Sequence, residues 1–240
     1  MPNNIIMANA KGGYTANDWF DLTKPVGELS YSGTSIPEGV IFTGHTGITK
    51  MDIKNVTEIP GNFCKNCSAL EEVELNANLT KINTTAFYGT SNLKQPIFVP
   101  RADITTASFE TSGITAIVCK GIISSQSYSF KSCPNLKAVD MVDATNTGNR
   151  TFQNSAKLST LILRNSSVAS LFSVDALSGT PFASGKSGGT LYVPSALIAS
   201  YQSASNWSTI LGYPNNRIEA IEGSIYETQY ADGTPIPTGG

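Results

Sequence analysis

The sequence is poor in charged residues and histidine, and it has no long apolar run. Only 14% of its 240 residues are charged, and the formal net charge is −2. No cluster of Lys or Arg occurs, and since proteins bind the nucleic-acid backbone through clustered cations, nucleic acid is not an expected partner. No apolar stretch approaches the roughly 18 residues that cross a bilayer, so we expect no membrane insertion.

The first residues, MPNNIIMANAKGG, lack the features of a secretory signal. They have neither a basic start nor an apolar core of about 7–15 residues. Unless a signal has been removed, we expect a protein that leaves the cell by another route, as a virion component does at lysis.

Uncharged polar residues take the place of the missing charge. The hydrophobic fraction is 40%, and Ser, Thr, Asn and Gly fill much of the remainder. Disordered chains usually combine low hydrophobicity with high charge, which is not the pattern here. The composition therefore predicts a folded, turn-rich protein with a polar but mostly uncharged surface.

A repeat of about 22 residues runs through the middle of the chain. Its anchors are five phenylalanines at intervals of 24, 22, 21 and 22: Phe63, Phe87, Phe109, Phe130 and Phe152. Each is followed by a small residue and then by an aliphatic one: Leu70, Leu93, Ile114, Leu136 and Leu158. Two anchors in phase over five units predict a solenoid, in which each coil buries its apolar face against its neighbours.

A short alternating stretch follows each aliphatic anchor and is typical of a strand with one buried face. An earlier stretch, ITKMDI, has the same phase. The predicted inward residues are Met51, Ile53, Val73, Leu75, Ile97, Val99, Ile117, Cys119, Val139, Met141, Leu161 and Leu163. We expect six parallel strands, one per coil, with the phenylalanines stacked on the opposite side.

The coil pattern I-x-x-I-x-x-x-x-F-x-x-C/S-x-x-L resembles the BspA-type leucine-rich repeats of bacterial surface proteins. The stretch LTKINTTAFYGTSNLKQPIFVP is close to that pattern, and the resemblance covers roughly residues 46–177. It implies a leucine-rich-repeat solenoid, mostly β with little helix, capped at both ends. Two stretches depart from the pattern: VDATNTGNRTF lacks the aliphatic pair, and Pro96 interrupts one strand, so we expect a bulge or an edge there.

The two ends of the chain do not repeat. GELSYSG and EGVIFTG predict short strands, and NDWFDLTKP predicts a brief helix. After the strand TLYVP, Ser195 is a candidate N-cap of a helix whose Tyr201, with Trp207, folds over the last coil. The tail beyond Ser224 is expected to be extended, either mobile or holding a neighbouring subunit. We divide the chain into an N-terminal cap or attachment segment (1–45), the solenoid (46–190), a C-terminal strand-helix cap (191–224) and an extended tail (225–240).

Catalytic and metal-binding constellations are not found in the sequence. The single histidine, His45, is interpreted as a turn residue, since no nucleophile elbow accompanies it. Cys64 and Cys67 form C-x-x-C, but Cys67 occupies the small-residue position also held by Ser91, Ser112, Cys133 and Ser155, which favours buried, reduced thiols. Glu72 and Glu74 are expected to be solvated, or to hold a cation weakly. The Gly-Lys-Ser in SGTPFASGKSGG precedes a strand and is interpreted as a loop. We expect no enzyme activity, cofactor or metal.

Strand alternation predicts a row of residues pointing away from the core. The row is Asp52, Glu74, Phe98, Val118, Asp140 and Ile162, with Tyr192 as its continuation. Three of these residues are apolar, more than a solvated surface needs, so the row is the candidate partner-binding face. The alternative is that a terminal segment of the chain itself packs there.

The sequence therefore favours a non-enzymatic structural or interaction protein. The first hypothesis is a phage virion component in the tail, baseplate, receptor-binding or capsid-surface position, located in the virion. The alternative is a bacterial cell-surface or secreted adhesin that binds a host protein or glycan. Expected partners are other structural proteins or a host surface receptor, and a homo-oligomer is compatible with the nonrepeating ends.

Overall fold

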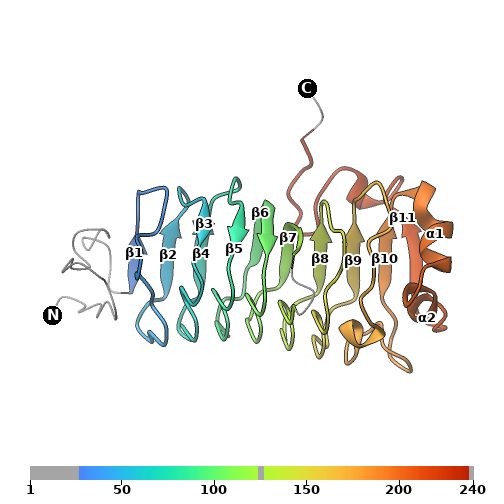
Figure 1. Ribbon diagram of the computed structural model, residues 1–240, viewed down its shortest axis with the longest axis horizontal. Helices are drawn as coiled ribbons and strands as arrows, with labels where there is room; N and C mark the ends of the chain where they lie inside the picture. The colour runs from blue at the N-terminus through green and yellow to red at the C-terminus, as the bar shows by residue number, and fades with distance from the viewer. Residues whose placement is uncertain (1–26, 124–126, 238–240) are drawn as a thin grey trace.

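The protein is an elongated stack of coils with a small helical end (Figure 1). The structure, a computed structural model, describes residues 27–123 and 127–237. The strands follow one another along the stack, and two short helices, α1 (Ile198–Ser203) and α2 (Trp207–Leu211), lie at the C-terminal end. The leucine-rich-repeat solenoid predicted from the repeat is confirmed.

All named strands pair in parallel, and they form two sheets. The first sheet has the order β1 (Glu28–Ser30), β2 (Lys50–Ile53) and β4 (Glu72–Leu75). The second sheet has the order β11 (Arg217–Ala220), β10 (Thr190–Val193), β9 (Thr160–Leu163), β8 (Ala138–Met141), β7 (Ala116–Ile122), β6 (Pro96–Ile104), β5 (Lys81–Ile82) and β3 (Glu58–Ile59). Three-residue or four-residue 3-10 turns complete the structure: η2 (Val174–Leu177), η3 (Ser195–Leu197) and η4 (Ile225–Glu227).

The predicted inward residues of the strands form the core. All are buried except Leu75, which is half-buried in β4. Successive coils place like residues opposite one another, as where Ile117 faces Val139 and Val139 faces Leu161. Because a single coil cannot bury its own apolar face, this register distributes one continuous core along the whole stack.

The boundary between the two sheets lies at Pro96. The inward Ile97 lies four positions after Leu93, whereas Val73 lies three positions after Leu70, so this coil contains an extra residue. Proline has no N–H to donate to the neighbouring strand. The side chain of Gln95 replaces the missing ladder: it accepts from the Val73 N–H (3.2 Å) and donates to the Val73 carbonyl (2.8 Å). The irregularity expected at Pro96 is thus an interruption bridged by a side-chain amide.

A second row of strands lies farther along each coil in the middle of the stack. It consists of β3, β5 and the ends of β6 and β7, in which Ile59 pairs with Ile82, Ile82 with Ile104, and Ile104 with Ile122. In the coil that reads VDATNTGNRTF, this row is reduced to a bridge between Asn146 and Ser170. The missing aliphatic pair therefore shortens the strand row without interrupting the stack.

The repeat phenylalanines form the predicted aromatic column. All five are fully buried. The rings from Phe87 to Phe152 stack in sequence, with centroid separations of 5.3, 5.9 and 5.9 Å. Each pair of near-parallel rings fills the space between two neighbouring coils, so the column reinforces the spacing that the strands set on the other side.

The small-residue position beside the column provides hydrogen bonds between coils. The thiol of Cys133 donates to the Phe109 carbonyl (2.9 Å), and the Ser155 hydroxyl donates to the Phe130 carbonyl (2.7 Å). One predicted member is wrong: the buried hydroxyl in the second coil belongs to Thr90, while Ser91 is exposed. In the second coil, as in the later coils, the small-residue position lies three residues after the phenylalanine.

The stack begins before residue 46. The strand predicted in GELSYSG is confirmed as β1, whereas EGVIFTG forms no strand and instead contributes buried Val40 and Phe42. Phe42 packs edge-on against Phe63 at 5.4 Å, and its N–H donates to the Phe63 carbonyl, so this turn is hydrogen-bonded to the coil that follows it. Residues 28–45 are therefore a coil of the same stack. The helix expected in residues 17–25 lies outside the described residues.

The C-terminal cap closes the last coil as predicted. Tyr201 and Trp207 are fully buried, and both hydrogen-bond to the same residue of the final coil, Ala169. The Ala169 N–H donates to the Tyr201 hydroxyl (2.9 Å), and the Trp207 indole donates to the Ala169 carbonyl (2.8 Å). Ser195 is not a helix N-cap, because η3 starts at this residue and its side chain accepts no capping bond.

Candidate interaction face

The predicted outward row is in register across the strands. Asp52 pairs with Glu74 in the first sheet. In the second sheet, Phe98 pairs with Val118, Val118 with Asp140, Asp140 with Ile162, and Ile162 with Tyr192. The interruption at Pro96 divides the row into an N-terminal half, Asp52 and Glu74, and a C-terminal half from Phe98 to Tyr192.

The C-terminal half is covered by the end of the chain. After β11, residues 222–237, which we call the C-terminal segment, turn back from the helical end and run along the stack toward β7 (Figure 1). Val118, Asp140 and Ile162 beneath it are fully buried. This arrangement is the alternative left open by the sequence, in which a terminal segment packs on the row. Partner binding by the row stays a prediction.

A buried ion pair is the centre of the contact between the face and the segment. The Arg164 guanidinium donates to both carboxylate oxygens of Asp140, at 2.7 and 2.8 Å. The side chain of Arg164 is 12% exposed and that of Asp140 is 0% exposed. Burial raises the pKa of Asp140, against the opposing effect of the guanidinium. A charge buried this deeply requires a full set of hydrogen bonds.

The C-terminal segment provides the remaining hydrogen bonds of this ion pair. Arg164 also donates to the carbonyls of Tyr226 (2.8 Å) and Gln229 (3.1 Å), and the Ala231 N–H donates to Asp140 (3.1 Å). Two aromatic contacts flank the pair: Tyr230 packs against Phe98 at 5.4 Å, and Tyr226 packs against Tyr192 at 4.7 Å. The Arg164 guanidinium additionally lies 5.1 Å from the Tyr230 ring centroid.

The sequence analysis missed Arg164, Tyr226 and Tyr230. Asp140 was nevertheless a usable indication, since a lone carboxylate between the apolar positions Val118 and Ile162 needs a cationic partner. Arg164 has the outward phase of the neighbouring strand, two residues beyond Ile162. The tyrosines carry no such pattern, because they belong to a nonrepeating segment.

The N-terminal half of the row is open and ion-paired. Lys50 lies 2.8 Å from Glu72 and 3.2 Å from Glu74, and Lys54 lies 2.8 Å from Asp52. Lysines therefore neutralise the carboxylates that the sequence offered as a weak cation site. Within residues 27–123 and 127–237, no group of three or more His, Cys, Asp or Glu side chains is arranged to hold a metal.

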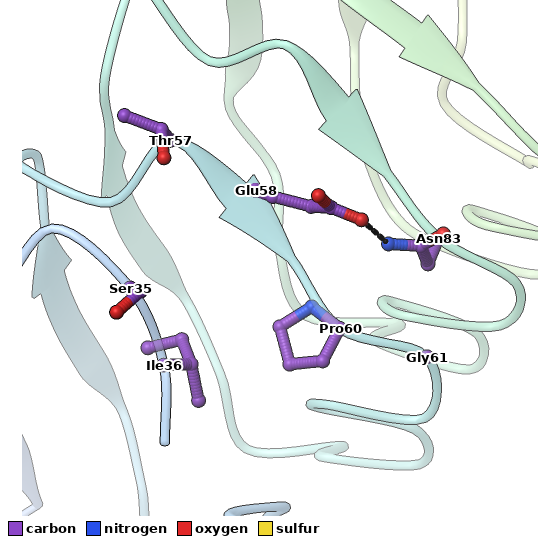
Figure 2. Close-up of a pocket in the computed structure, with 7 residues that line it drawn as sticks. All are labelled: Ser35, Ile36, Thr57, Glu58, Pro60, Gly61 and Asn83. Atoms are coloured by element: carbon purple, nitrogen blue, oxygen red, sulfur yellow. Dashed lines mark hydrogen bonds between the residues drawn. The ribbon is translucent and has the colours of Figure 1, made fainter. Parts of the chain in front are cut away.

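A separate cleft of about 390 Å³ lies beside β3 (Figure 2). Its lining residues are Ser35, Ile36, Thr57, Glu58, Pro60, Gly61 and Asn83. The Asn83 amide donates to Glu58 (2.7 Å) and to the Ile59 carbonyl (2.9 Å). Because the amide and the carboxylate already bind each other, the cleft offers no group that requires a ligand, and we assign it none.

His45 is a turn residue, as predicted. Its Nδ1 accepts from the N–H groups of Gly47 (3.1 Å) and Ile48 (3.2 Å). Partial burial lowers the pKa of the ring, which favours the neutral form that this geometry requires. The ring therefore stabilises a turn.

The four cysteines are free and buried, as predicted. Burial raises the pKa of Cys133 to about 12 and raises that of Cys64 and Cys119 as well. These three are therefore thiols at neutral pH, and the thiolate is the form that binds metals and reacts. The Gly-Lys-Ser predicted to be a loop lies in turns before β10, with Lys186 exposed.

None of the helices in the described part of the chain is long and apolar enough to cross a bilayer. No curated protein matches the chain significantly.

The fold is similar to the crystal structure of a leucine-rich repeat protein from Bacteroides ovatus, at 17% sequence identity and a TM-score of 0.47. That alignment covers 70% of this chain, which spans 55% of the other protein. The BspA type Leucine rich repeat region, as a family, matches in six copies over residues 28–115 and 57–172, more than half of the sequence. The chain therefore belongs to the BspA-type leucine-rich repeat family.

Proposed function

We propose that this chain is a non-enzymatic interaction protein that binds another protein through the face formed by the outward row of its strands. The observation that carries the proposal is the register of that row, which places like positions of successive coils side by side along the stack. Leucine-rich repeat domains generally mediate protein–protein interactions and generally act as scaffolds rather than enzymes.

Within that role, we propose a component of a phage particle. The support is compositional: a folded protein with 14% charged residues and a Ser/Thr/Asn-rich surface suits packing among other structural proteins. Antibodies against the recombinant chain should label purified virions in electron microscopy, and the chain should be found by mass spectrometry in particles after density-gradient purification. Labelling of the host cell surface, with clean virions, would contradict this location.

The second candidate is a bacterial surface adhesin, which the BspA-type family favours. The same labelling experiment separates the two, since an adhesin is found on intact cells that carry no phage. Binding of the purified chain to immobilised host proteins or glycans, with labelled cells, would support the adhesin.

A further inference from the structure

The C-terminal segment is bound to the core but does not belong to it. Every residue from 222 to 237 is exposed or half-buried, whereas Val118, Asp140 and Ile162 beneath them are fully buried. Gly223, at φ +80 and with open space around it, marks the start of the segment. A segment with few buried groups of its own is the kind that opens at low cost in free energy.

The C-terminal segment is held in shape by hydrogen bonds between its own residues. The Tyr230 N–H donates to the Thr234 carbonyl (2.8 Å), and the Ile236 N–H donates to the Thr228 carbonyl (2.9 Å). Asp232 accepts from the N–H and hydroxyl of Thr234. Residues 228–236 therefore form a small turn whose internal bonds do not depend on the strands below.

The face supplies a complete set of groups for such a turn. Arg164 donates to two backbone carbonyls, Asp140 accepts from one backbone N–H, and Phe98 and Tyr192 each contact a tyrosine. Backbone groups are present in any peptide, so only the two tyrosines make this set selective.

The charged pair also fits a face that opens. A permanently covered surface gains no stability from a buried ion pair, since well-packed apolar residues of similar volume serve equally well or better. Arg164 and Asp140 become solvated, however, when the segment leaves, which keeps an uncovered face with Phe98, Val118 and Ile162 from being wholly apolar.

We propose that the strand face from β6 to β10 is a peptide-binding site, occupied in the free protein by residues 222–237. Its partner is a protein that presents a tyrosine-bearing turn of the same chemistry and displaces the segment. This proposal rests on the proposed interaction function and names the kind of partner that the face takes.

The test uses the full chain and a labelled synthetic peptide of residues 221–237. In the variant Tyr226→Ala/Tyr230→Ala, the tethered segment loses its aromatic anchors while the face is unchanged. We expect this variant to bind the peptide at least about tenfold more tightly than the unmodified chain, in which the tethered segment competes at roughly millimolar effective concentration. A peptide with alanine at both tyrosines is the matched control and should not bind. Fluorescence anisotropy measures all four combinations.

Two outcomes would overturn the proposal. If the folded variant binds no peptide, the segment is a fixed cover; if variant and unmodified chain bind equally, the peptide uses another site. Should the variant fail to fold, hydrogen exchange on the unmodified chain replaces it: excess peptide should speed exchange at the Ala231 amide, which donates to Asp140 across the contact, and unchanged exchange would refute displacement. Labelling of virions is independent of these results, so failure here leaves the proposed location intact.

Discussion

The two halves of the outward row have the same register and opposite environments. In the N-terminal half, Lys50, Lys54 and their carboxylate partners have side chains that are 22–59% exposed. In the C-terminal half, Asp140 and Arg164 are 0% and 12% exposed under the C-terminal segment. Strand alternation fixes which residues point outward, but only a covering segment decides whether an outward charge is solvated. Ion pairs of the first kind contribute little to stability, whereas breaking one of the second kind leaves a buried charge.

The largest expected effect comes from removing the cation of the covered half. Arg164→Met leaves Asp140 buried without its partner and deprives the Tyr226 and Gln229 carbonyls of their donor. We expect a loss of about 3–5 kcal/mol in the free energy of unfolding. Urea denaturation measures it, and limited proteolysis should show faster cleavage within residues 222–237.

Lys50→Met is the matched substitution in the open half, and we expect no measurable change in the urea midpoint. The double variant Asp140→Leu/Arg164→Met removes both buried charges and should regain most of the stability that the single substitution loses. If Arg164→Met lowers the free energy of unfolding no more than Lys50→Met does, the difference in exposure between the two halves does not produce a difference in stability.

The next effect concerns the seam between the halves. Gln95→Leu keeps the size of the side chain but leaves the N–H and carbonyl of Val73 without their partner. Since Val73 is 3% exposed, we expect a loss of about 1–3 kcal/mol in the free energy of unfolding. Hydrogen exchange should accelerate at the Val73 amide, because the substitution removes the Gln95 oxygen to which that N–H donates.

Lys94→Leu is the control for this substitution, since Lys94 is exposed beside Gln95. It should change neither the stability nor the exchange rate. Slow exchange at Val73 in the Gln95→Leu variant would mean that the two sheets are joined by something other than this side chain.

The periodic features of the fold could be predicted from the sequence because they are local. Residues such as Phe109 and Phe130 recur with the coil, and alternation in AVDM determines that Val139 faces inward and Asp140 outward. The first coil could have been found by the same rule: Phe42 lies 21 residues before Phe63, and Ile48 lies 22 before Leu70. In that coil the small-residue position is occupied by His45. Because histidine is not a small residue, the coil does not match the repeat pattern there.

The cover on the face could not be predicted, because it depends on contacts between distant residues without a period. Arg164 and Tyr226 are 62 residues apart, and Asp140 and Ala231 are 91 apart. The role of Gln95 was hidden for a different reason: Pro96 indicated a broken ladder, but a glutamine beside it does not reveal that its amide bridges the gap. The alternation of residues along a strand thus predicts which way each side chain points, whereas tertiary contacts determine how exposed that side chain is.

The smallest expected effect is a pH dependence that arises at His45, in the first coil of the stack. His45 must be unprotonated at Nδ1 to accept from Gly47 and Ile48, and burial holds the pKa of the folded-state ring below the 6.5 of an unfolded chain. Between these two pKa values the unfolded chain binds more protons, so the stability that the turn contributes is present above about pH 6.5 and is lost as the pH falls through the folded-state pKa.

His45→Asn tests this assignment, because asparagine offers a nearby side-chain acceptor that does not titrate. Asn76 and Asn146 already accept in this way from the backbone two residues on, each at 2.9 Å. We expect the Tm of the unmodified chain to fall more than that of His45→Asn between pH 7 and pH 5. His45 is the only histidine, and subtracting the two profiles removes the contribution of carboxylates such as Asp140. The loss should also be local, with faster hydrogen exchange at Ile48 and no change at the Ala231 amide; parallel profiles for the two proteins would show that protonation of His45 does not weaken the turn.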